Sequence, residues 1–289
     1  MNDLTDTAGQ ESQAELDDWL RHGSSFGTAA AAYAAHRPGY AEAAVRWALQ
    51  LPEGEPPESP RAPRAGGRAV PARRVLDLAA GTGKLTAALV GLGAEVTAVE
   101  PDPDMLAELR RGLPSVRALR GRAEEIPLPD GSVDAVLAGQ AMHWFDLDRA
   151  VPEIARVLAP GGVLAGLWNL DDDRMDWVAA LAAISKGKSN ITLRRWREGT
   201  GRSRLERLAA AGAGLFEAPE IGEFAHGQRR TADLLVETVA THSSFLVMSG
   251  PDRSRLLAQV RDLLYARPET AAGEFVLPMV TVVLRARRL

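Results

Sequence analysis

The 289-residue sequence contains no cysteine. This absence excludes disulfide bonds, a thiolate metal site and a cysteine nucleophile. Basic charge is not in excess either, because 34 lysines and arginines are set against 38 acidic residues, for a net charge of −4. Without an overall positive field, binding to nucleic acid or to an anionic membrane is not expected. The five histidines include no pair at the i, i+4 spacing of helical metal ligands, so no metal site is predicted.

Long apolar runs and a secretory signal are missing as well. No run approaches the roughly twenty apolar residues that a membrane-spanning helix needs. Residues 1–20 lack the basic-then-apolar order of a signal peptide. The predicted location is therefore the cytoplasm, and the predicted partner is a small molecule. The oligomeric state is not predicted, because no helical pattern shows an apolar surplus that demands a partner.

What is present is an alternation of strand and helix patterns. Strands are predicted in the stretches VLDLA, EVTAVE, VRALRG, VDAVLAG and VLAGLWN, with helical patterns between most of them. Such alternation predicts an α/β fold, in which a parallel sheet has helices on both faces. Two later strands are predicted in EIGEFAHGQRR and FVLPMVTVVLRA.

Composition divides the chain into six segments. Residues 1–24 are acidic and polar and are expected to form a disordered tail, and residues 25–50 a helical lid. Residues 51–72 are rich in Pro, Gly, Glu and Arg, which is typical of a surface linker. The predicted core spans 73–170, a helical substrate cap spans 171–214, and residues 215–289 complete the core sheet.

The most specific motif is a glycine loop that follows a buried-strand pattern, VLDLAAGTGKLT at residues 75–86. Gly81 and Gly83 allow the backbone to approach a ligand closely. The next strand ends at Glu100, where a carboxylate can accept both hydroxyls of a ribose. Loop and carboxylate together predict a cofactor that contains adenosine. A dinucleotide fingerprint needs a third glycine where this chain has Thr86, which argues against a nicotinamide cofactor.

The loop, written Asp77-x-Ala79-x-Gly81-x-Gly83, resembles motif I of class I S-adenosylmethionine-dependent methyltransferases, with alanine for the first glycine. Segments that resemble later motifs follow in the family's order: EPDPDML, GRAEEIPLPDGSVDAV and LAPGGVLAGLWN. FGTAAAAYAAHRPGY, AGQAMHWFD and VLPMVTVVLRAR are similar to small-molecule methyltransferases of the trans-aconitate and ubiquinone-biosynthesis type. The similarity begins near Phe26 and is strongest over 75–170.

This resemblance implies both a fold and a reaction. The fold is a doubly wound, Rossmann-like sheet of seven strands, mostly parallel with an antiparallel last strand, plus a helical lid and cap. The reaction moves a methyl group from S-adenosyl-L-methionine to an oxygen, nitrogen or carbon of a small molecule, leaving S-adenosyl-L-homocysteine and using no metal. Catalysis is expected to depend mainly on positioning for an in-line displacement.

The predicted cofactor-binding residues come from these motifs and from the N-terminal helical pattern. They are Tyr33, Arg37, Asp77, Ala79, Gly81, Thr82, Gly83, Glu100, Pro101, Met105, Ala123, Glu124 and Gln140. Glu100 is expected to hold the ribose by charge-assisted hydrogen bonds. Asp77 either orders the loop or reaches the cofactor amino group through water. Met105 either covers an adenine face or fills the core.

The two ends of the cofactor have separate candidate contacts. In the family, positions equivalent to Ala123 and Glu124 meet adenine through a backbone amide and a carboxylate, and Glu125 is an alternative to Glu124. Tyr33 and Arg37 lie one helical turn apart and can close over a carboxylate such as the methionine tail. The alternative is a helix that packs its tyrosine and solvates its arginine.

The predicted substrate pocket contains His143, Trp144, Trp168 and Asn169. His143 is the one candidate catalytic residue, as a general base for an acidic hydroxyl or amine, because imidazole titrates near neutrality. The alternative for His143 is positioning or a structural hydrogen bond. The tryptophans either wall the acceptor or the sulfonium, or pack in the core. A basic run over 186–207 either steers an anionic acceptor or is a solvated helix face.

Two other functions stay open on the sequence alone. The first is a fold that binds S-adenosylmethionine without methyl transfer, as a cyclase, an isomerase or a regulatory protein. The second is an NAD-dependent dehydrogenase, against which Thr86 argues.

Overall fold

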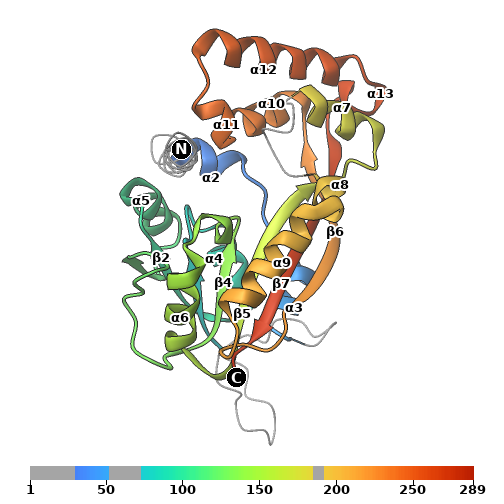
Figure 1. Cartoon of the computed structure of the whole chain (residues 1–289). Coiled ribbons are helices and arrows are strands. Elements are labelled where there is room, and N and C mark those ends of the chain that lie inside the picture. Colours follow the sequence, from blue (N-terminus) through green and yellow to red (C-terminus); the bar gives the residue numbers. More distant parts are fainter. Residues whose placement is uncertain (1–29, 52–72, 185–191) are drawn as a thin grey trace, which may run out of the picture.

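The structure is a computed structural model that describes residues 30–51, 73–184 and 192–289. The tail predicted at 1–24 and nearly all of the linker predicted at 51–72 lie outside the described residues. The described chain forms one seven-stranded sheet in the order β3-β2-β1-β4-β5-β7-β6 (Figure 1). The strands are β1 Arg74–Leu78, β2 Glu95–Glu100, β3 Arg117–Arg120, β4 Val133–Gly139, β5 Leu158–Asp171, β6 Glu220–Arg230 and β7 Phe275–Arg287.

Strand direction follows the predicted fold class. Strands β1 to β5 pair in parallel, whereas β7 is antiparallel to both of its neighbours, β5 and β6. The doubly wound, seven-stranded α/β fold with an antiparallel last strand is therefore confirmed. The strand order reverses between β1 and β4, which is the point where sheets of this kind bind their ligands.

Helices cover both faces of the sheet. Helices α6 (Leu147–Val157) and α9 (Gly201–Ala211) pack on the face that carries Leu76. Helices α3 (Glu42–Ala48) and α4 (Lys84–Gly91) pack on the face that carries Val75. Neighbouring residues of β1 are thus buried on opposite sides, which explains why the strand is apolar without alternation. Helix α5 (Pro103–Gly112) lies beside β2 and β3.

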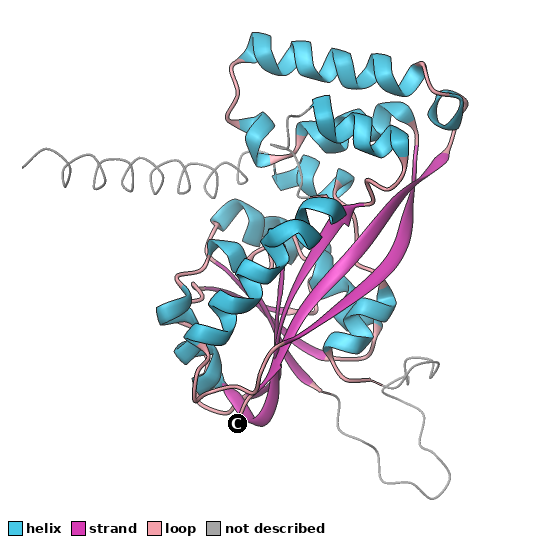
Figure 2. Ribbon diagram, turned by 45° about the vertical axis from the view of Figure 1, so that its right-hand side comes forward, coloured by secondary structure: helices cyan, strands magenta, loops and turns pink. Residues whose placement is uncertain are grey.

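A second helical layer packs around the far ends of β5, β6 and β7, which extend beyond the rest of the sheet (Figures 1 and 2). It consists of α7 Asp176–Ile184, α10 Ala232–Ala240, α11 Ser243–Leu246, α12 Gly250–Tyr265 and α13 Pro268–Ala271. Trp177, Val236, Phe245 and Met279 belong to its separate apolar core. This layer draws on residues from both the predicted cap at 171–214 and the predicted sheet completion at 215–289.

Shorter elements connect the two layers. Helix α2 (Ala30–His36) contacts both α10 and α5, and so lies between the helical layer and the sheet. The single turn α8 (Leu193–Arg195), the π-helical turn η3 (Trp196–Thr200) and α9 follow one another on the other side. None of the helices in the described ranges is long and apolar enough to cross a membrane.

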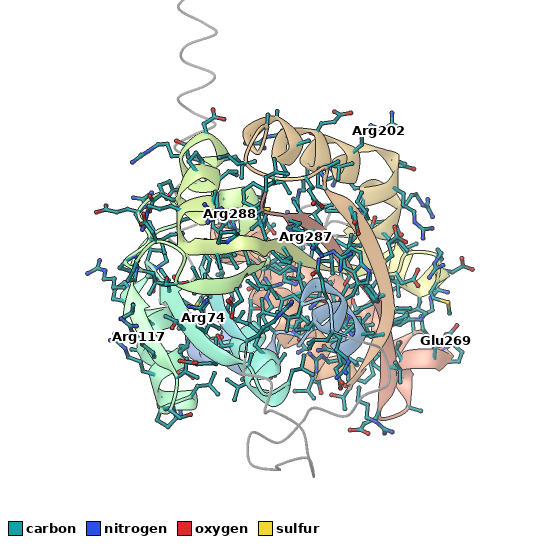
Figure 3. The ribbon with its side chains drawn as sticks, turned by 90° about the horizontal axis from the view of Figure 1, so that it is seen from below. Arg74, Arg117, Arg202, Glu269, Arg287 and Arg288 are labelled. Carbon is teal, nitrogen blue, oxygen red and sulfur yellow. The ribbon has the colours of Figure 1, made fainter. Side chains whose placement is uncertain are left out.

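Arginines lie at the edge of the sheet where the parallel strands begin (Figure 3). Arg74 Nη2 is 2.6 Å from Asp134 Oδ1, and Arg287 Nη2 donates to Gln50 Oε1 at 3.1 Å. Arg288 donates to the carbonyl oxygen of Leu158. Arg74 and Arg288 thus join strand ends, and Arg287 joins β7 to Gln50, which follows α3, at the edge opposite the carboxyl ends of β1 and β4.

Candidate functional site at the carboxyl ends of the parallel strands

A pocket of about 610 Å³ lies at the carboxyl ends of β1, β2 and β4. Most of the predicted cofactor-binding residues line it: Asp77, Ala79, Gly81, Thr82, Glu100, Pro101, Met105, Ala123, Glu124 and Gln140. Segments that are separate in the sequence are therefore brought together around one cavity. A pocket of several hundred cubic ångströms is the size that a small ligand or cofactor occupies.

Gly83 and Arg37 do not line this pocket. Gly83 precedes α4 with φ +87°, and a Cβ there would lie 3.0 Å from Leu113 Cδ1. Gly83 thus allows a turn and a close helix contact. Arg37 Nη2 donates to the carbonyl of Thr241 at 3.2 Å, beside the helical layer. The side chain of Tyr33 lies outside the described residues.

Two backbone amides orient the carboxylate of Glu100. Oε2 accepts a hydrogen bond from the Gly81 N–H at 2.8 Å, and Oε1 accepts one from the Asp102 N–H at 2.9 Å. Each oxygen keeps a further lone pair for a ligand. Burial raises the pKa of Glu100 to about 7, although both amide bonds act in the opposite direction. Glu100 is thus a preorganised pair of acceptors at the end of β2.

Asp77 presents an unsatisfied oxygen to the same pocket. Its Oδ2 accepts a hydrogen bond from Thr86 Oγ1 at 2.6 Å, whereas its Oδ1 is buried without a partner in the described part of the chain. The hydroxyl of Thr82 is also buried without a hydrogen-bond partner in the described ranges. Burial raises the pKa of Asp77 to about 7. Such buried groups are costly unless a ligand satisfies them, so these residues fit a ligand that carries hydrogen-bond donors.

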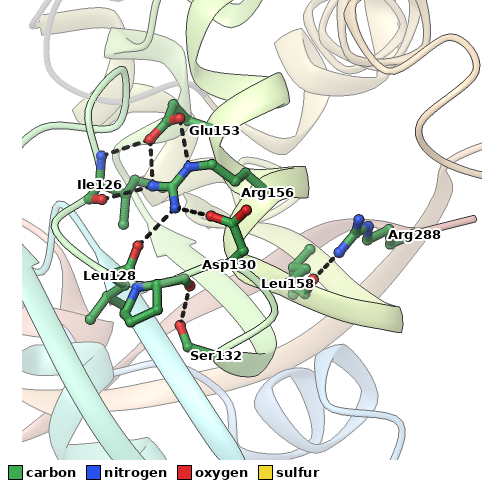
Figure 4. Close-up of polar contacts among 9 residues, drawn as sticks. Ile126, Leu128, Asp130, Ser132, Glu153, Arg156, Leu158 and Arg288 are labelled. Carbon is green, nitrogen blue, oxygen red and sulfur yellow. Dashed lines mark hydrogen bonds and ion pairs between the residues drawn. The ribbon is translucent and has the colours of Figure 1, made fainter.

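Arg156 on α6 holds residues 126–130, the segment that follows Ala123 and Glu124 in the chain (Figure 4). Its guanidinium donates to the carbonyls of Ile126 and Leu128 at 2.9 and 2.8 Å. It also contacts the carboxylates of Asp130 and Glu153, and Glu153 in turn accepts from the Ile126 N–H at 3.1 Å (Figure 4). This bidentate network fixes one wall of the pocket against the sheet.

Two non-glycine residues of the pocket have left-handed backbone conformations. Ala79 has φ +56° and Gln140 has φ +55°. Each costs on the order of 1–2 kcal/mol, and such strain is typically found at functional sites. Gln140 is held in this conformation by its N–H, which donates to the Leu167 carbonyl at 2.8 Å, and by Nε2, which donates to the Asn169 carbonyl at 3.0 Å.

Of the predicted substrate-pocket residues, Trp144 lines the pocket, and His143, Trp168 and Asn169 do not. Trp168 is 2% exposed and packs on Trp196, with ring centroids 5.3 Å apart. His143 Nδ1 accepts a hydrogen bond from Trp168 Nε1 at 3.2 Å. Desolvation lowers the pKa of His143 to about 3, so the ring is neutral at physiological pH. Asn169 is 2% exposed, and its side chain forms hydrogen bonds with Gly39 and Thr281.

Several lining residues were not predicted, among them Tyr40, Lys84, Asp102, Gly139 and Phe145. Lys84 belongs to the glycine-loop motif itself, and Asp102 to the segment after Glu100, so adjacency was an available signal. Tyr40 ends the N-terminal segment FGTAAAAYAAHRPGY, whose resemblance to the family was the only signal for it. In the described ranges, no group of three or more His, Asp or Glu side chains is arranged to hold a metal ion.

Comparison with known proteins agrees with this geometry. Residues 76–166 match a family model described as a methyltransferase domain. An uncharacterized methyltransferase of Mycobacterium tuberculosis is 41% identical over 263 residues, covering 91% of this chain and 95% of that protein. A demethylmenaquinone methyltransferase of Chlorobaculum tepidum is 42% identical over 91 residues, covering 31% of this chain and 38% of that protein.

Solved structures share the fold as well. A structure from Anaeromyxobacter dehalogenans, provisionally named a type II methyltransferase, has a TM-score of 0.54 and 26% identity, covering 87% of this chain and 97% of that chain. The identity to the mycobacterial protein extends over nearly the whole chain, so it includes the helical layer as well as the matched domain. The chain belongs to the class I S-adenosylmethionine-dependent methyltransferases.

Proposed function

We propose that the protein transfers a methyl group from S-adenosylmethionine to an oxygen, nitrogen or carbon of a small molecule. The observation that carries this proposal is the buried Oδ1 of Asp77, which has no partner among the described residues and lies in a pocket that also contains the oriented carboxylate of Glu100. An adenosine-containing cation supplies what both groups need, since its ribose hydroxyls and its ammonium group are hydrogen-bond donors.

Different pocket residues would bind different parts of the cofactor. Glu100 would accept from the ribose hydroxyls, while Asp77 and Thr82 would hold the amino-acid end. Ala123 would offer its backbone amide to adenine, and Met105, 4% exposed, would pack against the base. Glu124 Oε1 already accepts from the Asp146 N–H at 3.1 Å, and Oε2 lies 3.5 Å from Arg122 Nε. The lone pairs that these contacts leave would accept from the exocyclic amine.

Transfer then depends on position rather than on a protein base. When bound, S-adenosylmethionine supplies an electrophilic sulfonium methyl group. Tyr40 and Trp144 both line the pocket, and their aromatic faces suit a positive charge and exclude water. His143 stays neutral and holds Trp168, which makes it a positioning residue. An acceptor that is itself acidic, or that loses its proton to water, needs no general base from the protein.

The acceptor side is assigned to the helical layer and α2, and the donor side to residues 73–170. A small-molecule acceptor is supported by the match to the demethylmenaquinone methyltransferase, whose named substrate is not a macromolecule. It is also supported by the size of the pocket, about 610 Å³, and by the layer of α7 and α10–α13 at the far ends of β5, β6 and β7 (Figure 2). Incubation with methyl-labelled donor and a bacterial extract should label low-mass compounds; label in protein or nucleic acid alone would contradict the proposal.

Calorimetric titration tests the donor assignment. S-adenosylhomocysteine should bind, and Glu100→Ala should weaken its affinity at least tenfold, since charge-assisted hydrogen bonds contribute about 1.5–3 kcal/mol. Glu95→Ala is the matched control, because Glu95 lies at the opposite, exposed end of the same strand. Unchanged affinity in Glu100→Ala would show that the ribose is held elsewhere. Binding of NADH without S-adenosylhomocysteine would replace the proposal by a dehydrogenase.

A further inference from the structure

A buried hydrogen-bond network joins the sheet to the segment before α3, with Thr281 of β7 at its centre. Thr281 Oγ1 donates to Asn169 Oδ1 at 2.6 Å and accepts from the Ala41 N–H at 3.1 Å. Asn169 Nδ2 donates to the Gly39 carbonyl at 2.9 Å. Thr281 and Asn169 are 0% and 2% exposed, so water does not compete for the two hydrogen bonds of the Thr281 hydroxyl.

His226 on β6 completes the network. Its Nε2 lies 3.1 Å from Thr281 Oγ1. A threonine hydroxyl has one proton and two lone pairs, and the proton is already given to Asn169. His226 must therefore donate, which places a proton on Nε2. Thr281 then uses its full hydrogen-bonding capacity, and β5, β6 and β7 all contribute to holding Gly39 and Ala41.

Gly39 and Ala41 flank Tyr40, whose ring lines the donor pocket. The ring fills the space beside Gly139 at the end of β4. A Cβ on Gly139 would lie 2.8 Å from Tyr40 Cζ, closer than real Cβ atoms approach other atoms. The Asn169 carbonyl also accepts from Gln140 Nε2 at 3.0 Å. Asn169 thus contacts both segments that form this side of the pocket.

We propose that Thr281 and Asn169 are positioning residues for methyl transfer that act through Tyr40. Their network holds Gly39–Ala41 so that the Tyr40 ring closes the pocket against Gly139, and this wall fixes the donor beside the end of β4. The inference rests on the proposed function, because it assigns S-adenosylmethionine to the pocket. It gives a role to Thr281 and His226, neither of which is among the predicted site residues.

A double-mutant cycle between Tyr40→Ala and Thr281→Val tests the proposal. Valine has the shape of threonine but leaves Asn169 Oδ1 and the Ala41 N–H without their partner. We expect Thr281→Val to weaken S-adenosylhomocysteine binding about tenfold in the wild-type background and less than about twofold in the Tyr40→Ala background. Thr281→Ser, which keeps the hydroxyl, should restore the wild-type affinity. Equal losses in both backgrounds would show that the network supports the fold and not Tyr40, and would overturn the proposal.

A second pair of variants leaves the network intact, in case Thr281→Val does not fold. Gly139→Ala should displace the Tyr40 ring and weaken binding, and adding Tyr40→Ala should recover part of the affinity because the new methyl group then has room. If the double variant binds no better than Gly139→Ala alone, the ring does not form this wall. Failure of the proposed function has a different result, since the wild-type protein would then not bind S-adenosylhomocysteine and Glu100→Ala would change nothing.

Discussion

His143 follows β4 at the ligand edge of the sheet, where a general base would lie, yet its surroundings suit another role. Its Nδ1 already accepts from Trp168 Nε1, and desolvation lowers its pKa to about 3. A general base is most effective when its pKa lies near the working pH. Within the proposed function, His143 is therefore expected to act on the position of Trp168 and not on a proton of the acceptor.

Two substitutions at His143 separate these roles. The Oδ1 of His143→Asn can take the place of Nδ1 as the acceptor for Trp168, so turnover should stay within about threefold of wild type. His143→Leu leaves the Trp168 N–H unsatisfied and should lower the free energy of unfolding by about 1–3 kcal/mol. Steady-state kinetics and urea unfolding measure both effects. A loss of turnover of about a hundredfold in His143→Asn, with S-adenosylhomocysteine affinity unchanged, would identify a base after all.

The pocket-lining residues that the sequence could predict are those whose position depends on local structure. Asp77, Gly81 and Glu100 lie at strand ends, and a strand followed by a turn places such residues at the ligand edge of a sheet. Tyr40 reaches Gly139 from a distant segment, and no local pattern encodes that contact. Trp168 and Asn169 were expected near a strand end, but β5 continues to Asp171 and packs on both faces there, which buries them.

At the scale of elements, the turn between β1 and α4 depends on its glycines in two different ways. Gly81 has φ +57°, and a Cβ there would meet no protein atom, so within the protein without ligand only backbone conformation requires this glycine. Gly83 has φ +87°, and a Cβ there would also lie 3.1 Å from Leu109 Cγ on α5. The second glycine therefore determines how closely α5 approaches the beginning of α4.

Alanine substitutions should reveal this difference. Gly81→Ala should cost on the order of 1–2 kcal/mol in the free energy of unfolding, because an L residue is strained in the left-handed region. Gly83→Ala should cost at least about 1 kcal/mol more, because the new methyl group crowds Leu109 and Leu113. Urea unfolding of both variants without ligand measures the two values. Equal losses of unfolding free energy in the two variants would contradict this, because they would mean that α5 can move away from the turn without an energetic cost.

At the scale of the whole molecule, two buried carboxyl groups make stability depend on pH. Asp77 and Glu100 have pKa values raised to about 7 in the folded protein, against ordinary values of about 4 in an unfolded chain. Between about pH 4 and pH 7 the folded state therefore binds more protons than the unfolded state. The free energy of unfolding should fall as pH rises through this window, because of these two groups.

Thermal unfolding across this pH range tests the effect against a matched variant. The double variant Asp77→Asn, Glu100→Gln cannot ionise at either position, so its melting temperature should decline less from pH 5 to pH 8. Ligand binding to the wild-type protein favours the ionised carboxylates, so S-adenosylhomocysteine should raise the melting temperature more at pH 8 than at pH 5.5. Parallel curves for wild type and variant would contradict the assignment of the shifts.

The overall fold could be predicted because strands covered on both faces are apolar throughout and alternate with helical patterns. The separate apolar core of the helical layer could not be predicted from the sequence. The patterns over Thr231–Thr241 and Pro251–Ala266 predict helices, which the structure shows as α10 and α12, but an apolar helix face does not say which surface it covers. That α10 and α12 pack with α7 follows from the length of β5, β6 and β7, which extend beyond the first core.

The place of β7 between β5 and β6 has a consequence for the protein while it is being synthesised. Strand β6 is complete at Arg230, but the strand that pairs with it begins only at Phe275. At roughly 5–20 residues per second, a ribosome leaves β6 without its partner for several seconds. During that interval its backbone donors and acceptors are open to pairing with other chains. Strand β5 ends earlier, at Asp171, so its edge toward β7 is open for longer still, and a chaperone that binds nascent chains would have its longest opportunity there.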